Sequence, residues 1–383
     1  QGQPWDLMAW SFNGKFEDRS WTTKSIPQLQ QEAAVVLSLG GGFQAYFSQK
    51  RDGSISLWQM NLMSEVAKFC RARQKYCHKA QPVPQIGLLF STDALYRRSD
   101  RLFGPWTPQT DIVTGILQCL LESQNSVDLL SEHHLATRLR DYPLIVIPQW
   151  DYLKPAILSE LRRYVERGGN LLLIGHQSAS LFAAQLDVKF KIDTTDKLQW
   201  LEHEAWLACI KTRCSALKLG KTAKPFGKLY AQNDFVGPHQ PPASITRLGK
   251  GKIAAIYFNL GEQYRIGANA VTRAFLQSIV RELFAAPMVE VTGSRYVDVA
   301  VNKINGKLAI NLVNTAGPHA DARVLVFDEI PPVGPLQISS RSDRKPARVT
   351  LRPEGKSLKF LYTKGKILLT LPILHIHSVI VIE

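Results

Sequence analysis

Short apolar runs alternate with amphipathic segments along the first part of the chain. Residues 6–12 form an apolar and aromatic run typical of a buried strand, and residues 26–39 follow with helical spacing. A second strand over residues 43–48 and a second helix over residues 57–76 repeat the pattern. This order predicts a parallel sheet. Two such units bury too little apolar surface to fold alone, so we expect them to complete a barrel with further strands.

A second strand–helix series begins after Pro82 and Pro84. Its apolar runs predict strands over residues 86–90, 127–130, 144–147, 171–174 and 252–258, and its amphipathic segments predict helices over residues 111–122, 155–167 and 268–284. Strands without polar alternation are covered by helices on both faces, which predicts a doubly wound sheet. Between Asp193 and Thr246 the pattern weakens, and we expect an elaborated loop or short strands there.

Beyond Pro287 the hydrophobic period becomes two. Apolar residues alternate over residues 297–301 and 308–312, and Asn305-Gly306 between them is a strong hairpin signal. No helical pattern follows, so the sequence predicts an antiparallel β-sandwich of about eight strands, as is typical of such domains. The chain is therefore expected to contain three domains, over residues 1–82, 83–286 and 287–383.

The composition excludes several classes of protein. The 383 residues are 45% hydrophobic and 21% charged, as in ordinary globular proteins. No run of eighteen apolar residues occurs, so no membrane-spanning helix and no membrane partner are expected. The net charge of +15 is spread along the chain rather than gathered in one patch. Nucleic-acid binding is therefore a hypothesis that rests on charge alone, and no nucleic-acid partner is expected.

The sequence lacks the patterns of common cofactor and metal sites. Its five cysteines show no CxxC spacing and their odd number does not suggest a disulfide framework. The pairs His133-His134 and His375…His377 have no third ligand nearby, and the second pair is expected to share one face of a strand. Neither a phosphate-binding loop nor a dinucleotide fingerprint is present. We expect no cofactor and no metal.

Five segments carry a resemblance to a known family. Asp141–Gly175, an apolar strand ending in Pro, a helix ending in Tyr-Val-x-x-Gly-Gly and another apolar strand, resembles the amidotransferase-like trimerisation domain of family 42 β-galactosidases and related glycosidases. Leu248–Gly261 is similar to a late strand of that domain, and Tyr296–Asn314 to the opening of the β-domain that follows it. Trp5–Asn13 and Gly41–Ile55 are similar to the last two strands of a glycosidase barrel.

The resemblance implies a fold of the α/β plus all-β class. It would consist of a partial (β/α) barrel, a flavodoxin-like, class I amidotransferase-like domain and a C-terminal β-sandwich. It implies that the chain is the C-terminal part of a glycoside hydrolase, β-galactosidase-like or α-fucosidase-like. Such a protein would act on carbohydrate, form a homo-oligomer (dimer or trimer) and be secreted or periplasmic. The alternative is a non-catalytic module for oligomerisation or carbohydrate binding.

Glycoside hydrolysis requires two carboxyl groups that flank one bond, and barrel enzymes carry them at the C-terminal ends of strands. Glu17, Asp18 and Asp52 follow the two predicted barrel strands and are the candidate catalytic residues. The alternative for each is a loop acid or a helix cap. By the family pattern, the acid/base on the fourth barrel strand would lie before Gln1.

Sugars present apolar C–H faces that pack on aromatic rings, while polar groups hold their hydroxyls. Trp10 and Trp21 are the candidate stacking residues, with Lys50 and Arg51 as polar partners; the alternative for the tryptophans is barrel core. Ser178 and His176 lie on one turn and could form a catalytic dyad. Alternatively, Ser178 or Ser180 caps a helix. We favour the structural alternative for that turn.

Overall fold

The computed structural model describes residues 4–15, 20–99, 110–321 and 323–383. Contacts group the chain into two compact units. The first contains Gln1–Val83, Gln124–Ser126 and Met288–Glu383, and the second contains Pro84–Ser123 and Val127–Pro287. The predicted first and third domains thus lie in one unit. In the described ranges no helix is long and apolar enough to cross a membrane.

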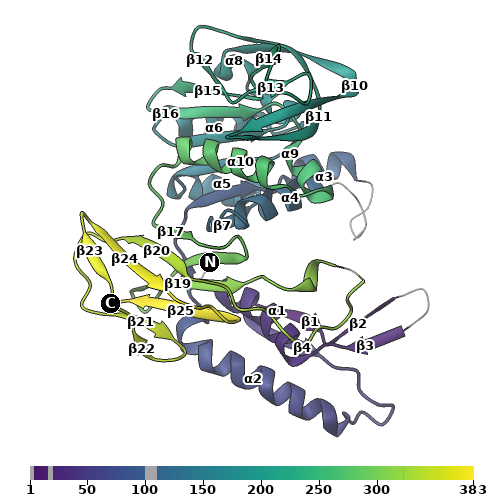
Figure 1. The fold of residues 1–383 in the computed structure, drawn as a ribbon, viewed down its shortest axis with the longest axis vertical. Coiled ribbons are helices and arrows are strands. Elements are labelled where there is room, and N and C mark those ends of the chain that lie inside the picture. Colours follow the sequence, from purple (N-terminus) through teal and green to yellow (C-terminus); the bar gives the residue numbers. More distant parts are fainter. Residues whose placement is uncertain (1–3, 16–19, 100–109, 322) are drawn as a thin grey trace. The chain divides into compact units, whose positions relative to one another are not determined.

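The first unit opens with the two predicted strand–helix pairs (Figure 1). β1 (Asp6–Trp10) and β4 (Gly42–Tyr46) pair in parallel, with Trp10 opposite Tyr46. Helix α1 (Ile26–Ser38) precedes β4 and helix α2 (Leu57–Cys77) follows it. A hairpin of β2 (Phe12–Lys15) and β3 (Ser20–Thr23) lies between β1 and α1 in sequence. The predicted order of elements is confirmed.

The rest of the first unit is a β-sandwich of two antiparallel sheets. One sheet contains, in order, β17 (Val289–Thr292), β20 (Leu336–Arg341), β24 (Lys366–Leu371) and β23 (Leu361–Thr363). The other contains β22 (Lys356–Ser357), β21 (Val349–Arg352), β25 (His377–Ile382), β19 (Lys307–Asn314), β18 (Val297–Ile304) and β5 (Gln81–Pro82). The predicted hairpin at Asn305-Gly306 is confirmed, because both residues have positive φ, as its type of turn requires.

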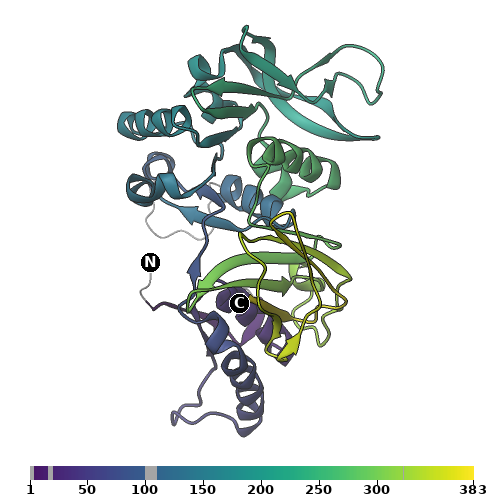
Figure 2. The same cartoon turned by 90° about the vertical axis from the view of Figure 1, so that its left-hand side faces the viewer.

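Helices α1 and α2 cover the outer face of the second of these sheets (Figures 1 and 2). All six residues of β25 are buried, although strands of a sandwich usually alternate. One side of β25 faces the opposite sheet, whereas the other side packs against the helices. The helix–sheet core consists of Ala33, Ala34, Leu37, Phe69, Cys77, Ala309, Val313, Val379 and Val381. The barrel-like segment is therefore anchored to the sandwich.

The second unit is built on a seven-stranded sheet. Its strands in order are β12 (Ala223–Phe226), β15 (Ala243–Leu248), β16 (Gly251–Ile256), β9 (Asn170–Ile174), β8 (Leu144–Ile147), β6 (Ile86–Leu89) and β7 (Val127–Leu130). The five strands from β16 to β7 are parallel, and β15 and β12 are antiparallel additions. For four of the five strands predicted in this segment, both observed bounds lie within one residue of the predicted bounds.

Helices surround this sheet, as the absence of polar alternation predicts. They are α3 (Thr92–Arg98), α4 (Asp111–Leu121), α5 (Glu132–Arg138), α6 (Pro155–Glu166), α7 (His176–Ser180), α8 (Ala183–Leu186), α9 (Leu260–Ile266) and α10 (Ala270–Leu283). Every residue of β6 and β8 is buried. Figure 2 shows α6 and α10 on opposite sides of the strands between them.

The segment expected to be a loop or short strands is instead a long antiparallel hairpin. β10 (Val188–His203) pairs with β11 (Trp206–Leu219), and β10 also pairs with β13 (Leu229–Tyr230), which pairs with β14 (His239–Gln240). The prediction was wrong because much of β10 is exposed on both faces and therefore shows no apolar alternation. Two register shifts also interrupt the pairing.

Helices α4 and α9 approach closely through a pair of glycines. A Cβ built on Gly115 would lie 1.8 Å from the carbonyl oxygen of Gly261, and one on Gly261 would lie 2.3 Å from the carbonyl oxygen of Ile112. We expect Gly115→Ala to lower the free energy of unfolding by about 3 kcal/mol or more, because backbone must move. Gly267→Ala, at a site with no neighbour within 4 Å, is the matched control. Equal urea midpoints for both variants would contradict this packing.

A buried histidine links α2 to β25. The Nε of Arg73 donates to the Nδ1 of His377 at 3.1 Å, and its guanidinium also donates to the His377 carbonyl at 3.0 Å. His377 is 2% exposed, and its Nε2 lies 3.2 Å from the Oδ1 of Asn311. Burial, with the nearby Arg73 charge, lowers the pKa of His377 to about 3. The ring is therefore neutral at pH 7.

This lowered pKa makes stability depend on pH. Between the unfolded pKa of about 6.5 and the folded pKa, only the unfolded chain binds the proton, so stability falls as the pH falls. Between pH 7 and pH 5, the His377 ring should lower the free energy of unfolding of the wild type by about 2 kcal/mol. We expect this contribution to disappear in His377→Gln, as measured by urea unfolding at each pH. His375→Gln, at an exposed neighbour, should leave the loss unchanged. The same pH dependence in His377→Gln and the wild type would be inconsistent with a neutral buried ring.

Candidate functional site

Aromatic side chains gather at the carboxyl ends of β1 and β4. Trp10 and Tyr46 are the last residues of these strands and are register partners. The ring of Phe12 lies 5.5 Å from that of Trp10, 5.1 Å from that of Trp21 and 6.2 Å from that of Tyr46. These four residues form what we call the aromatic cluster. The structure thus brings together both predicted stacking residues, and it adds Phe12, which the sequence analysis missed.

The aromatic cluster is accessible to a ligand. Trp10, Trp21 and Tyr46 are 44%, 46% and 42% exposed. In this chain, these rings are therefore open to solvent rather than enclosed in a core. Phe12 was predicted as the end of one strand over residues 6–12, whereas the structure ends β1 at Trp10 and begins β2 at Phe12.

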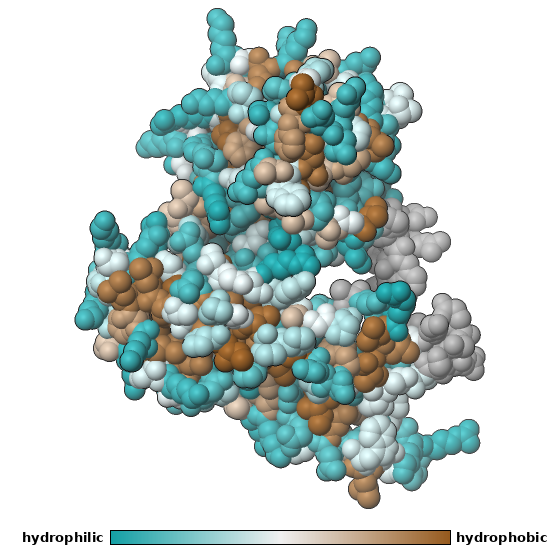
Figure 3. Space-filling model, viewed as in Figure 1, coloured by the Kyte–Doolittle hydropathy of each residue, from teal (hydrophilic) through white to brown (hydrophobic). Residues whose placement is uncertain are grey.

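The sheet face that carries Trp10 is largely uncovered. Met8 lies on the same side of β1 and is 50% exposed. At the amino-terminal end of β1, the Nε2 of Gln44 donates a hydrogen bond to the Oδ2 of Asp6 at 2.5 Å. On the opposite face, Phe43 and Ala45 of β4 pack against Leu29 and Leu62, whereas Leu7 of β1 is 56% exposed. Figure 3 shows hydrophobic surface in the region of β1, β4 and the beginning of α2.

Both edges of this small sheet are also open. Within the described residues the sheet contains only β1 and β4. Further apolar side chains are exposed next to it, at the beginning of α2: Leu57 is 86%, Trp58 59% and Met60 49% exposed. A large exposed apolar patch marks an interaction surface.

Lys50, Arg51 and Asp52 lie on one exposed turn after β4. The Lys50 amide donates to the Ser54 carbonyl at 2.8 Å, and the Gly53 amide donates to the Lys50 carbonyl at 3.0 Å. The Oδ1 of Asp52 accepts from the Ser54 hydroxyl at 2.7 Å and from its amide at 2.9 Å. These bonds lower the pKa of Asp52. A lowered pKa does not suit a general acid, and the two bonds from Ser54 show that Asp52 organises its own turn.

Glu17 and Asp18 lie outside the described residues. Asp6 begins β1 and therefore lies at the opposite end of the strand from Trp10.

The turn after β9 carries no nucleophile. Ser178 is fully buried and its hydroxyl donates to the Ile174 carbonyl at 2.8 Å, and Ser180 donates to the His176 carbonyl at 2.7 Å. The expectation that one of these serines caps the helix was wrong: Gly175 is the N-cap and the serines bond to the preceding turn. Burial, followed by the Arg213 charge, lowers the pKa of His176.

The histidine pairs do not form metal sites in the described part of the chain. His134 accepts from the Ser131 amide at 3.2 Å and helps to begin α5. The expectation that His375 and His377 share a strand face was wrong, because β25 begins at His377 and only that residue is buried. All five cysteines are free thiols.

The buried serine provides a direct test of the structural role of this turn. We expect a fluorophosphonate, which labels activated serines, to leave Ser178 unmodified in the folded protein, because its oxygen is inaccessible and bonded to backbone. Intact-mass and peptide mass spectrometry measure the labelling, with urea-unfolded protein and a Ser178→Ala variant as controls. Rapid labelling of Ser178 in the folded state would show that the site is reactive.

Comparison with known proteins gives similarity of fold. No family model and no curated protein matches the sequence. The α-L-fucosidase isoenzyme 2 of Paenibacillus thiaminolyticus matches 98% of this chain and 60% of its own, with a TM-score of 0.80 and 15% identity. Gan42B, a GH42 β-galactosidase from G. stearothermophilus, matches 100% of this chain and 54% of its own, with a TM-score of 0.67 and 14% identity.

A β-galactosidase from Bacillus circulans sp. alkalophilus matches in the same way, with a TM-score of 0.65, 12% identity and coverage of 100% of this chain and 56% of its own. The chain therefore spans between half and two thirds of the length of these proteins. At such low identity the comparison establishes the fold. The resemblance to family 42 β-galactosidases and related glycosidases, expected from the sequence, is confirmed: this chain has the fold of about half of a glycoside hydrolase of that kind.

Proposed function

We propose that this chain is a part of a glycoside hydrolase, and that its aromatic cluster binds the sugar. The observation that carries the proposal is the position of Trp10 and Tyr46 at the carboxyl ends of two adjacent parallel strands. Active sites of (β/α) barrels lie at that end of the strands. The fold shared with an α-L-fucosidase and with β-galactosidases supports a fucoside or galactoside as the substrate class.

The open edges and uncovered face of the small sheet support the proposal that further barrel strands pair with β1 and β4. Strands of a closed barrel pair along both edges and bury the side chains of the inner face. In this chain both edges are open, and Met8, Trp10 and Tyr46 are exposed on one face. In the proposed enzyme, strands outside this sequence cover that face and supply the catalytic carboxyl pair, with Glu17 and Asp18 retained as candidates beside it.

The second unit is proposed to be a flavodoxin-like assembly domain. Numbered along the chain, its parallel strands lie in the order 2-1-3-4-5, which is the flavodoxin-like order of doubly wound sheets. The buried Ser178 leaves its sharp turn without a nucleophile, which supports a structural, amidotransferase-like role without amidotransferase chemistry. A homo-oligomer, either dimer or trimer, and a secreted or periplasmic location belong to the same proposal.

A non-catalytic carbohydrate-binding or oligomerisation module is the second candidate. It is favoured by two observations: the aromatic cluster is exposed, and the lowered pKa of the candidate Asp52 does not suit a general acid. Hydrolysis of 4-nitrophenyl β-D-galactoside and α-L-fucoside by the protein isolated from its source separates the two. Turnover of either compound supports the enzyme, and its absence, together with sugar binding, supports the module.

Sugar binding by the aromatic cluster is tested with D-galactose and L-fucose. We expect Trp10→Ala to weaken binding of the recognised sugar about tenfold or more, since it removes the ring on which the sugar packs. Saturation-transfer NMR on the folded chain measures the binding. Trp206→Ala, at a 70% exposed tryptophan of the second unit, is the matched control and should bind as the wild type does.

Two results would contradict the proposal for the cluster. One is that neither sugar gives a saturation-transfer signal with the wild-type chain at millimolar concentration. The other is that Trp10→Ala and Trp206→Ala bind with the same affinity. Circular dichroism of each variant checks that the fold is kept.

A further inference from the structure

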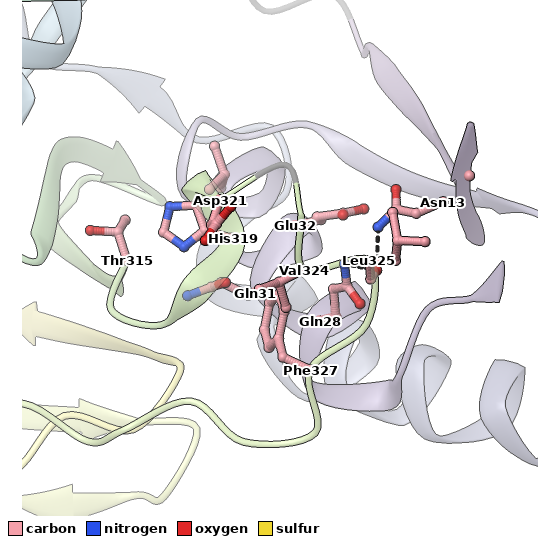
Figure 4. A pocket seen from close by; sticks show the side chains of 12 residues that line it. Asn13, Gln28, Gln31, Glu32, Thr315, His319, Asp321, Val324, Leu325 and Phe327 are labelled. Atoms are coloured by element: carbon pink, nitrogen blue, oxygen red, sulfur yellow. Dashed lines mark hydrogen bonds between the residues drawn. The ribbon is translucent and has the colours of Figure 1, made fainter. Parts of the chain in front are cut away.

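A pocket in the first unit lies between α1 and the residues Thr315, His319, Asp321, Val324, Leu325 and Phe327 (Figure 4). Its volume is about 470 Å³, which falls within the usual range of ligand sites. Asn13 of β2 contributes to its wall, whereas the neighbouring Phe12 belongs to the aromatic cluster. None of the four cluster residues is among the described residues that line the pocket, so the pocket and the cluster are separate.

The walls of this pocket are held together by specific hydrogen bonds. The Nε2 of Gln31 donates to the Asn314 carbonyl at 2.8 Å and to the Ala316 carbonyl at 3.0 Å. The Nδ2 of Asn13 donates to the Leu325 carbonyl at 2.7 Å, and the Ser25 hydroxyl donates to the Phe327 carbonyl. Side chains of β2 and α1 thus fix the backbone of the opposite wall, and the pocket is preformed.

Two buried oxygens of α1 lack partners in this pocket. Gln28 is only 6% exposed; its Nε2 lies 3.4 Å from the Leu325 carbonyl, while its Oε1 has no hydrogen-bond partner among the described residues. Glu32 pairs through Oε1 with the Nζ of Lys24 at 2.7 Å, and its buried Oε2 likewise lacks a partner within the described chain. Unpartnered buried acceptors are unfavourable, and a ligand with O–H groups would satisfy them.

The charges around the pocket are balanced. Lys24 neutralises Glu32, and Arg323 contacts Asp321 through both carboxylate oxygens, at 2.9 and 2.7 Å. Because no net charge is left, the pocket favours a neutral ligand over an ion. Phe327, which is 7% exposed, and Val35 provide apolar wall beside the two acceptors. Apolar wall next to hydrogen-bond acceptors fits a compound with C–H faces and hydroxyl groups.

We propose that this pocket binds a neutral polyhydroxylated small molecule of the size of a monosaccharide. Its hydroxyl groups donate to the Oε1 of Gln28 and the Oε2 of Glu32, and its C–H face packs on Phe327. The site is distinct from the aromatic cluster and is proposed independently of any hydrolytic activity. No covalent step takes place in it.

Occupancy of the pocket is tested with four neutral monosaccharides: D-galactose, D-glucose, D-mannose and L-fucose. Val35→Trp fills the pocket from a helix position that is 40% exposed and so spares the buried groups. We expect it to abolish binding of the recognised sugar to the Trp10→Ala chain, in which the aromatic cluster is disabled. Leu39→Trp, at a 50% exposed position just after α1, is the matched control and should bind normally.

A second variant probes the acceptors themselves. We expect Gln28→Leu to weaken binding about tenfold, the effect of one lost hydrogen bond to a ligand. Saturation-transfer NMR with Trp10→Ala as the parent separates this site from the cluster: loss of signal in the parent itself assigns all binding to the cluster and overturns the proposal. No binding of any of the four sugars, or equal binding by Val35→Trp and Leu39→Trp, also overturns it.

Discussion

Packing of α1 and α2 onto the outer face of the sandwich is the interaction on which the first unit depends. A two-stranded parallel sheet has no stability of its own, because each strand pairs on one edge only. Here Ala33, Ala34 and Leu37 of α1 pack against β19 and β25, while Leu29 of the same helix packs beneath β1 and β4. The helices therefore hold the small sheet in place from one side and leave its other face open.

That one-sided support accounts for the features of the candidate site. On the supported face, Phe43 and Ala45 of β4 pack on the helices, and the open face carries Met8, Trp10 and Tyr46. The rings therefore remain accessible at the strand ends, where barrel enzymes bind substrate. The same helix thus supports the small sheet and contributes Gln28 and Glu32 to the pocket beside Phe327.

Much of the fold was predictable because its signals are local. Asn305 and Gly306 adopt the positive φ angles that their hairpin requires. Gly169 follows Tyr164 in the family pattern for a steric reason, since a Cβ there would lie 2.1 Å from the tyrosine ring. The hairpin of β10 and β11 was missed because its exposed faces give no hydrophobic period. The pocket beside Phe327 was missed because its walls are about three hundred residues apart in sequence, and no local pattern records that Gln31 bonds to Asn314.

The openness of the β1–β4 sheet is tested most directly by residue-resolved amide hydrogen exchange. Gly42 donates to the Trp5 carbonyl and Ser11 to that of Tyr46, so by the alternation of a parallel ladder the amides of Met8 and Phe43 point away from the partner strand. The account predicts that these two amides exchange nearly as fast as in an unfolded chain, whereas that of Ile310 in β19 exchanges orders of magnitude more slowly. Protection of Met8 and Phe43 equal to that of Ile310 would show that both edges are already paired and would contradict it.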